Sequence, residues 1–121
     1  MTNNSLTLAY LGDAVYELYI RNFLISKGIV KVNNLQKEAV KYVSAKAQAY
    51  YLKSLIDIKF LKDEELIVVY RGRNHKNGHK PKNTDVVTYK NATGLEALIG
   101  YLYINNNSDR IQEIINYIIG E

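Results

Sequence analysis

Two acidic residues, far apart in the chain, stand in otherwise apolar runs and are the residues best suited to chemistry. Asp13 lies between Leu11-Gly12 and Ala14-Val15, and Glu96 lies in the run 95–100. A carboxylate placed in a core without a counter-charge takes up a proton rather than staying ionised. A hard divalent cation shared by the two side chains would keep both ionised, because such cations take oxygen ligands from several segments. The pair therefore predicts a metal-assisted active site.

Two further charged residues share a helical face with Asp13. Glu17 and Arg21 follow it at i+4 and i+8, so a helix would present all three side chains in one stripe. An ion pair between Glu17 and Arg21 would account for those two residues without any function, and it leaves Asp13 unexplained. Glu17, one turn beyond Asp13, is also a candidate for supporting a metal site from outside the coordination sphere.

The positive charge is concentrated in one segment. The 121 residues carry a net charge of +4, and residues 71–90 hold six lysines and arginines against one aspartate. Glycine and asparagine separate these cations, which suits contacts with backbone phosphates more than base stacking. Double-stranded RNA is recognised mainly in this way, so we predict a duplex RNA partner and no DNA partner. The predicted RNA-binding residues are Arg71, Arg73, Asn74, Lys76, Lys80, Lys82, Asn83 and Thr84.

A solvated basic loop without a partner is the alternative for this segment. The neighbouring carboxylate motif argues against it, because a phosphate substrate, cationic side chains and a metal ion are together the parts of phosphodiester hydrolysis. In that hypothesis the cation lowers the pKa of a bound water, which attacks phosphorus in line. His75 and His79 are too few, with Asn77-Gly78 between them, to predict a structural zinc site.

Composition excludes several classes of protein. The chain has no cysteine, which rules out a disulfide framework, a thiolate metal site and a cysteine nucleophile. The first residues lack the basic start of a secretory signal, and no long uncharged apolar run follows. We therefore expect a soluble cytoplasmic protein that does not associate with a membrane.

Helical periodicity dominates the chain, with one proline and no sustained period-two alternation. We predict an all-α fold forming a single domain over residues 1–121. We expect Ser44 to separate two helices, Glu64 and Glu65 to favour a helix start through the dipole, and Asn83 or Thr84 to cap a later helix. The expected helices run from Ser5 to Ser26, from Asn33-Asn34 to Val43, from Ala45 to about Ile58, from Asp63 through Tyr70, from Asp85 to about Ile104, and from Ser108 to the C-terminal isoleucines.

Several blocks resemble a known family. The runs 8–15 and 92–100 resemble the two signature motifs of ribonuclease III catalytic domains. More closely, the blocks Gly12–Glu17, Arg71–Asn74, Pro81–Val86 and Glu96–Tyr101 resemble Mini-ribonuclease III, the short type without a double-stranded-RNA-binding domain. Four matching blocks in the right order make a strong signal.

The resemblance implies a homodimeric helical bundle of the ribonuclease III catalytic-domain type that cleaves double-stranded RNA with Mg²⁺, for which Mn²⁺ can substitute. It implies maturation of the ends of the 23S ribosomal RNA precursor, with products bearing 5′-phosphate and 3′-hydroxyl ends. Carried over by position, Asp13 and Glu96 are the metal ligands and catalytic carboxylates. The segment from Arg71 to Thr84 would hold the duplex.

The chain departs from the full-length enzymes at two acidic positions. Those enzymes carry a glutamate where this chain has Ala9 and an aspartate where it has Thr93. A site of four protein carboxylates is therefore not expected. One Mg²⁺ held by Asp13, Glu96, waters and the scissile phosphate remains chemically sufficient.

Two alternatives stay open at this point. The first is a catalytically silent RNA-binding or ribosome-associated helical module, for which Ala9 and Thr93 are the best arguments. The second is an obligate dimer with purely structural duties, because the segment 6–25 is apolar on nearly every face and needs cover. The second alternative predicts no affinity for RNA.

Overall fold

The computed structural model describes residues 4–75 and 85–120, and these residues form helices without any strand. The result confirms the all-α prediction. The helices are α1 (Ser5–Ser26), α2 (Val32–Val43), α3 (Ala45–Asp57), α4 (Asp63–Arg73), α5 (Val86–Ile104) and α6 (Ser108–Ile119).

Most helix ends lie where the sequence places them, with two corrections. Ser44 does separate α2 from α3, because its extended backbone ends one helix and its hydroxyl accepts a hydrogen bond from Ala47 N at 3.1 Å. The start of α2 was predicted too late, since the extended residue before the helix is Lys31. Asp85, rather than Asn83 or Thr84, caps α5, because its Oδ1 accepts from Thr88 N at 2.8 Å.

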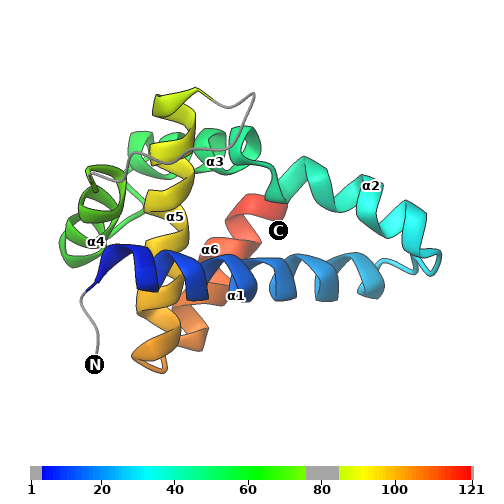
Figure 1. Cartoon of the computed structure of the whole chain (residues 1–121). Coiled ribbons are helices and arrows are strands. Elements are labelled where there is room, and N and C mark those ends of the chain that lie inside the picture. Colours follow the sequence, from blue (N-terminus) through cyan, green and yellow to red (C-terminus); the bar gives the residue numbers. More distant parts are fainter. Residues whose placement is uncertain (1–3, 76–84, 121) are drawn as a thin grey trace.

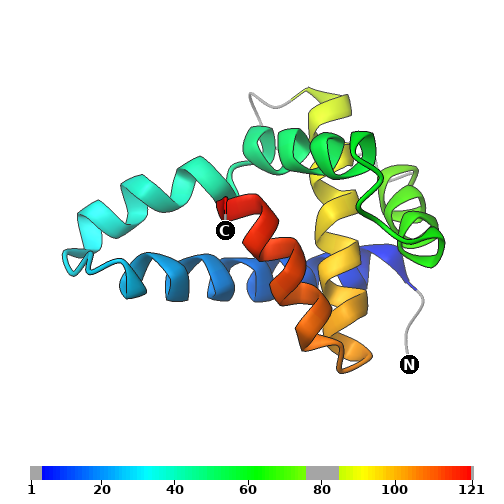
Figure 2. The same cartoon turned by 180° about the vertical axis from the view of Figure 1, so that it is seen from behind.

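Helix α5 is the central element of the fold. It contacts α1, α3, α4 and α6, and Figures 1 and 2 show α1 crossing it with α3 passing near its upper part. Burial of this helix is nearly complete from Ala92 to Leu102, with Glu96 and Tyr101 the partly exposed exceptions. An apolar helix of this kind stays folded only when neighbours cover it on several sides. Whatever α5 carries is therefore held rigidly.

The crossing of α1 and α5 depends on two glycines. A β-carbon at Gly12 would overlap the carbonyl oxygen of Glu96, and one at Gly100 would overlap the carbonyl oxygen of Leu8. The two backbones thus touch directly, which only glycine permits. Glycine inside a helix lowers stability by up to about 1 kcal/mol relative to alanine. The close backbone contact explains why glycine nevertheless occupies both positions. It also sets Asp13, next to Gly12, beside Glu96.

Helix α2 and the C-terminal half of α1 form an arm that extends away from the other helices (Figures 1 and 2). None of the α2 residues is fully buried. The arm is fastened near its base, where the hydroxyl of buried Tyr16 donates to the carbonyl of Tyr42 at 2.8 Å. This bond satisfies one of the carbonyls that the end of α2 leaves free.

A buried ion pair joins the starts of α4 and α6. Arg110 donates from Nε and from its terminal nitrogen to the two oxygens of Glu65, both at 2.8 Å, and also donates to the carbonyl of Phe60 at 2.7 Å. Burial raises the pKa of Glu65, but the hydrogen bonds from Arg110 and from the Lys62 backbone outweigh it, so the net pKa is lowered. The dipole interpretation of Glu65 was therefore incomplete, since its side chain turns inward to a partner on a later helix.

Replacing Gly12 or Gly100 by alanine is expected to lower the free energy of unfolding by at least about 3 kcal/mol, because neither backbone can move aside. Chemical denaturation followed by circular dichroism measures the effect. Gly94→Ala is the matched control, since its β-carbon would lie 2.9 Å from the Val69 carbonyl and demands a smaller shift. Equal losses at all three positions would contradict the crossing argument.

Candidate active site

Asp13 and Glu96 lie together at the crossing of α1 and α5. The backbone of Gly12, next to Asp13, packs directly against the carbonyl of Glu96, so the two acids come from adjoining positions on the two helices. Burial raises the pKa of Glu96 to about 8, with a further contribution from the charge of Asp13. The fold thus brings together two acids that repel when both are ionised.

The two carboxylates differ in exposure, which corrects one expectation. Both were expected among core residues, but Asp13 is exposed and Glu96 is only partly buried. The reason is that α5 covers one face of α1, while the adjoining face with Tyr10, Ala14 and Leu18 faces outward. The pair is therefore reachable from solvent.

Glu17 lies near this pair without joining it. Its side chain pairs with Arg21 at 3.8 Å, and both side chains are substantially exposed. This is the ion pair that the spacing suggested. Glu17 is also the smallest of the causes that raise the pKa of Glu96, so it lies close enough for its charge to act there.

The two positions that lack acids in this chain are occupied by buried residues without a carboxylate. Ala9 is buried and has no polar atom. Thr93 is buried as well, and its hydroxyl donates to the carbonyl of Tyr89 one turn earlier at 3.0 Å. Within the described residues, no group of three or more histidine, aspartate or glutamate side chains is arranged to hold a metal ion.

The Asp13–Glu96 pair nevertheless fits a hard divalent cation. Two adjacent carboxylates without a basic partner are relieved by a doubly charged ion, which would lower the pKa that burial and repulsion raise. Mg²⁺ is commonly held by one or two carboxylates, with waters and substrate phosphates completing its coordination. The donor set is therefore sufficient for such an ion and is smaller than a four-carboxylate site.

One polar residue at this site escaped the sequence analysis. Gln48 of α3 is 2% exposed, and its Nε2 donates to the Val43 carbonyl at 3.1 Å. The nearby amide lowers the pKa of Glu96, against the larger effects that raise it. The Oε1 of this amide is buried and has no hydrogen-bond partner. The sequence does contain a signal for this residue. Gln48 is a polar residue on the otherwise apolar face of α3, which it shares with Leu52 and Leu55.

The residues predicted to bind RNA are only partly within the described structure. Arg71 is exposed on α4, and Asn74, also exposed, ends that helix. Arg73 is half-buried, and its guanidinium lies over the ring of Tyr70 at 5.0 Å. The other predicted residues, Lys76, Lys80, Lys82, Asn83 and Thr84, lie outside the described residues.

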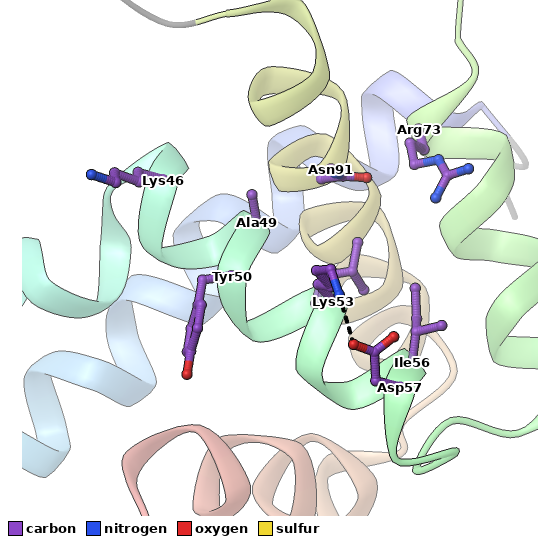
Figure 3. Close-up of a pocket in the computed structure, with 9 residues that line it drawn as sticks. Lys46, Ala49, Tyr50, Lys53, Ile56, Asp57, Arg73 and Asn91 are labelled. Atoms are coloured by element: carbon purple, nitrogen blue, oxygen red, sulfur yellow. Dashed lines mark hydrogen bonds and ion pairs between the residues drawn. The ribbon is translucent and has the colours of Figure 1, made fainter.

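Arg73 also lines a cavity of about 490 Å³ between α3, α4 and α5. Figure 3 shows three of the residues that line it, Lys53 of α3, Arg73 of α4 and Asn91 of α5, with a dashed line that joins Lys53 to Asp57. That ion pair is 2.8 Å long and exposed, so it adds little to stability. Lys46 and Lys53 of α3, which lie outside the basic segment 71–90, therefore line the same cavity as Arg73.

No helix in the described part of the chain is long and apolar enough to cross a membrane.

Comparison with known proteins agrees with this geometry. Residues 6–107 match the family model for the ribonuclease III domain. A Mini-ribonuclease 3 from Brevibacillus brevis is 54% identical over 112 residues, which is 93% of this chain and 82% of that protein. The Mini-ribonuclease 3 of Enterococcus faecalis is 47% identical over 116 residues, covering 96% of this chain and 88% of the relative. A crystal structure of a Fusobacterium nucleatum protein superposes with a TM-score of 0.87 at 36% identity, covering 98% of this chain and 94% of that one. The chain therefore belongs to the ribonuclease III family and, within it, to the Mini-ribonuclease 3 proteins.

Proposed function

We propose that this chain cleaves double-stranded RNA by metal-assisted hydrolysis at Asp13 and Glu96. Membership of the family makes the chain a ribonuclease III-type endoribonuclease, and the position of the site is our proposal. The observation that supports it is the pair of acids at the α1–α5 crossing, where burial and the charge of Asp13 raise the pKa of Glu96 and no ion pair of the described residues involves either acid.

In this proposal each acid has a distinct task. Asp13 and Glu96 would hold Mg²⁺, or Mn²⁺ in its place, which would supply activation of a water and neutralise charge that develops on the phosphoryl oxygens. Glu96, held on the rigid helix α5, fixes the position of the ion relative to the fold. Asp13, which is exposed on α1, faces the solvent from which RNA arrives. The leaving group is the 3′-oxygen, so the products carry 5′-phosphate and 3′-hydroxyl ends.

The natural substrate that we propose is the precursor of 23S ribosomal RNA, and the proposed site of action is the cytoplasm. The support is the likeness to Mini-ribonuclease 3 over nearly the whole chain. Arg71, Arg73 and Asn74 at the end of α4, with the segment up to Thr84, would contact backbone phosphates. Such contacts read duplex shape rather than sequence.

We also propose that two copies of the chain associate, each contributing one active site. Tyr10 and Leu18 are 84% and 56% exposed on α1, and with Ala14 between them they form an apolar stripe beside Asp13. A groove between α1 and α2, lined mainly by aliphatic residues, continues this surface. Exposed apolar area of this kind marks an interface, and a second copy would cover it.

Asp13→Asn and Glu96→Gln are each expected to abolish cleavage of a defined RNA duplex in Mg²⁺, because the ion loses one of its two protein ligands. Binding of the same duplex in EDTA should stay within about twofold of wild type, since phosphate contacts are made elsewhere. In the absence of RNA, millimolar Mn²⁺ should raise the melting temperature of the wild type and of neither variant. Full cleavage by Asp13→Asn would contradict the assignment of Asp13 as a metal ligand. If the wild-type protein cleaves the duplex neither in Mg²⁺ nor in EDTA, the alternative of a catalytically silent RNA-binding module is favoured.

Replacing Arg71, Lys80 and Lys82 by alanine should weaken duplex binding and make its salt dependence shallower, by about one unit of the log–log slope for each phosphate-binding cation that is removed. The matched control is Lys37→Ala, an exposed cation on α2. A filter-binding or fluorescence-anisotropy series over salt concentration measures both. Unchanged affinity for the duplex in the triple variant would contradict RNA binding by this segment and would support the alternative of a solvated loop without a partner.

Leu18→Glu is expected to convert a dimer into a monomer, because a charge cannot be buried against an apolar surface without a partner. Light scattering coupled to size exclusion gives the mass. Ile58→Glu, at a position 52% exposed at the end of α3, is the control and should leave the mass unchanged. A wild-type protein that is monomeric at micromolar concentration would refute the dimer.

A further inference from the structure

The cavity between α3, α4 and α5 gathers cations from two helices. Its volume is about 490 Å³, and it is bounded by α3, by the end of α4 and by the first half of α5. Lys46 and Lys53 come from α3, Arg73 from α4 and Asn91 from α5 (Figure 3). Pockets for small molecules have volumes of roughly 300–1,000 Å³, so this cavity is large enough for a nucleotide.

Helix α5 separates the cavity from the pair of acids. Asn91 precedes Glu96 by five residues, which at about 3.6 residues per turn places the two side chains roughly 140° apart around the helix. Figure 1 shows α1 passing in front of α5, and Figure 2, the view from behind, shows α3 in front of it. A ligand in the cavity would therefore lie apart from Asp13.

The charge of the cavity is positive and only partly compensated. Of the described residues that line it, Asp57 is the one acid, against two lysines and an arginine. Lys53 pairs with Asp57 at 2.8 Å, whereas no ion pair in the described part of the chain involves Lys46 or Arg73. An exposed ion pair is weak, so Lys53 can exchange Asp57 for a ligand. The cavity is therefore suited to an anion.

Phosphate is the anion that these side chains fit best. A guanidinium presents its N–H donors in a planar fork that matches two phosphate oxygens, and lysines add point charges beside it. The guanidinium of Arg73 lies over the ring of Tyr70 at 5.0 Å, a contact that favours one position of the long side chain. Less conformational freedom is then lost when it binds a phosphate.

The rest of the cavity wall is suited to a nucleoside. Ala49, Leu52 and Ile56 are apolar residues of α3 that line it. Tyr50, also on the wall, is 69% exposed, and its ring packs edge-on against that of Tyr51 with 5.5 Å between the ring centroids. Unpaired bases stack on exposed aromatic rings of this kind. The bases of a duplex are already paired and stacked, so only an unpaired nucleotide can place its base in a cavity.

We propose that this cavity is a nucleotide-binding site, separate from the proposed catalytic site, which takes the phosphate and the nucleoside of one unpaired ribonucleotide. Lys46, Lys53 and Arg73 bind the phosphate, and the apolar residues of α3 contact the nucleoside. The ligand is a free nucleotide or the unpaired end of an RNA strand, because both present this chemistry. The site does not depend on the proposed function, since neither Asp13 nor Glu96 takes part in it.

The test is binding of adenosine 5′-monophosphate to the full chain in EDTA at low salt, followed by the amide shifts in NMR spectra. We expect saturable shifts concentrated on α3, the end of α4 and the first half of α5. Adenosine and inorganic phosphate should each bind more weakly than the nucleotide, because each makes only part of the contacts. Absence of saturable shifts around the cavity would overturn the proposal.

Two substitutions of neighbouring charges should act in opposite directions. Lys53→Ala should raise the dissociation constant of the nucleotide about 5- to 10-fold, because a charge-assisted hydrogen bond is lost. Asp57→Asn should lower it about twofold, because a competing carboxylate is removed. The matched control is Lys37→Ala, an exposed lysine on α2 that should bind the nucleotide like the wild type. Arg73 is left unchanged, because the proposed function also gives it a contact with the duplex.

A single-stranded pentaribonucleotide with a 5′-phosphate distinguishes the two sources of the ligand. If it binds at the same amides more tightly than adenosine 5′-monophosphate, the ligand is an RNA end, and otherwise it is a free nucleotide. Asp13→Asn should bind the mononucleotide like the wild type, so the catalytic proposal and this one can fail separately. Wild-type affinity in both Lys53→Ala and Asp57→Asn, or an equal loss in Lys37→Ala and Lys53→Ala, would overturn the site.

Discussion

Direct contact between the backbones of α1 and α5 is the constraint on which the rest of the molecule depends. Gly12 and Gly100 let the two helices approach until carbonyl oxygens occupy the space where β-carbons would stand. Asp13 and Glu96 face each other because the neighbouring residues are locked by this contact. A separation larger by one methyl group at each glycine would disperse the two acids, so the fold and the chemistry rest on the same pair of small residues.

Two glutamates illustrate how the surroundings of a buried acid distinguish structure from function. Glu65 receives both arms of the Arg110 guanidinium, which holds its pKa below the usual value despite burial. For Glu96, burial and the charge of the nearby Asp13 raise the pKa to about 8. The first arrangement is complete within the chain, because every charge has its counter-charge. In the second, no cation within residues 4–75 and 85–120 pairs with the acids, and an uncompensated acid of this kind is typical of a binding site.

The sequence was sufficient for features that depend on local pattern. Helical periodicity and capping residues located the helices, and the apolar runs around Asp13 and Glu96 identified the pair that the fold brings together. It was insufficient where partners are remote. Glu65 was interpreted from its place in the first turn of α4, although Arg110 of α6 decides its role. Gln48 was overlooked because it lies within an amphipathic helix pattern. The residues around it in the sequence do not indicate that its side chain lies near Glu96. The exposure of Asp13 likewise depends on which side of α1 the later helix α5 covers.

Because Ala9 and Thr93 are buried and have no carboxylate, the proposed ion has only the carboxylates of Asp13 and Glu96 as protein ligands. Binding of the ion and binding of RNA would then be coupled. If a phosphate oxygen of the RNA coordinates the ion, RNA increases the affinity for the ion by the same factor by which the ion increases the affinity for RNA. If Asp13 and Glu96 are the metal ligands, as proposed, the RNA-free enzyme would bind its metal weakly. The RNA substrate would then supply a ligand that the protein lacks, and the complete metal site would form only when a duplex is bound.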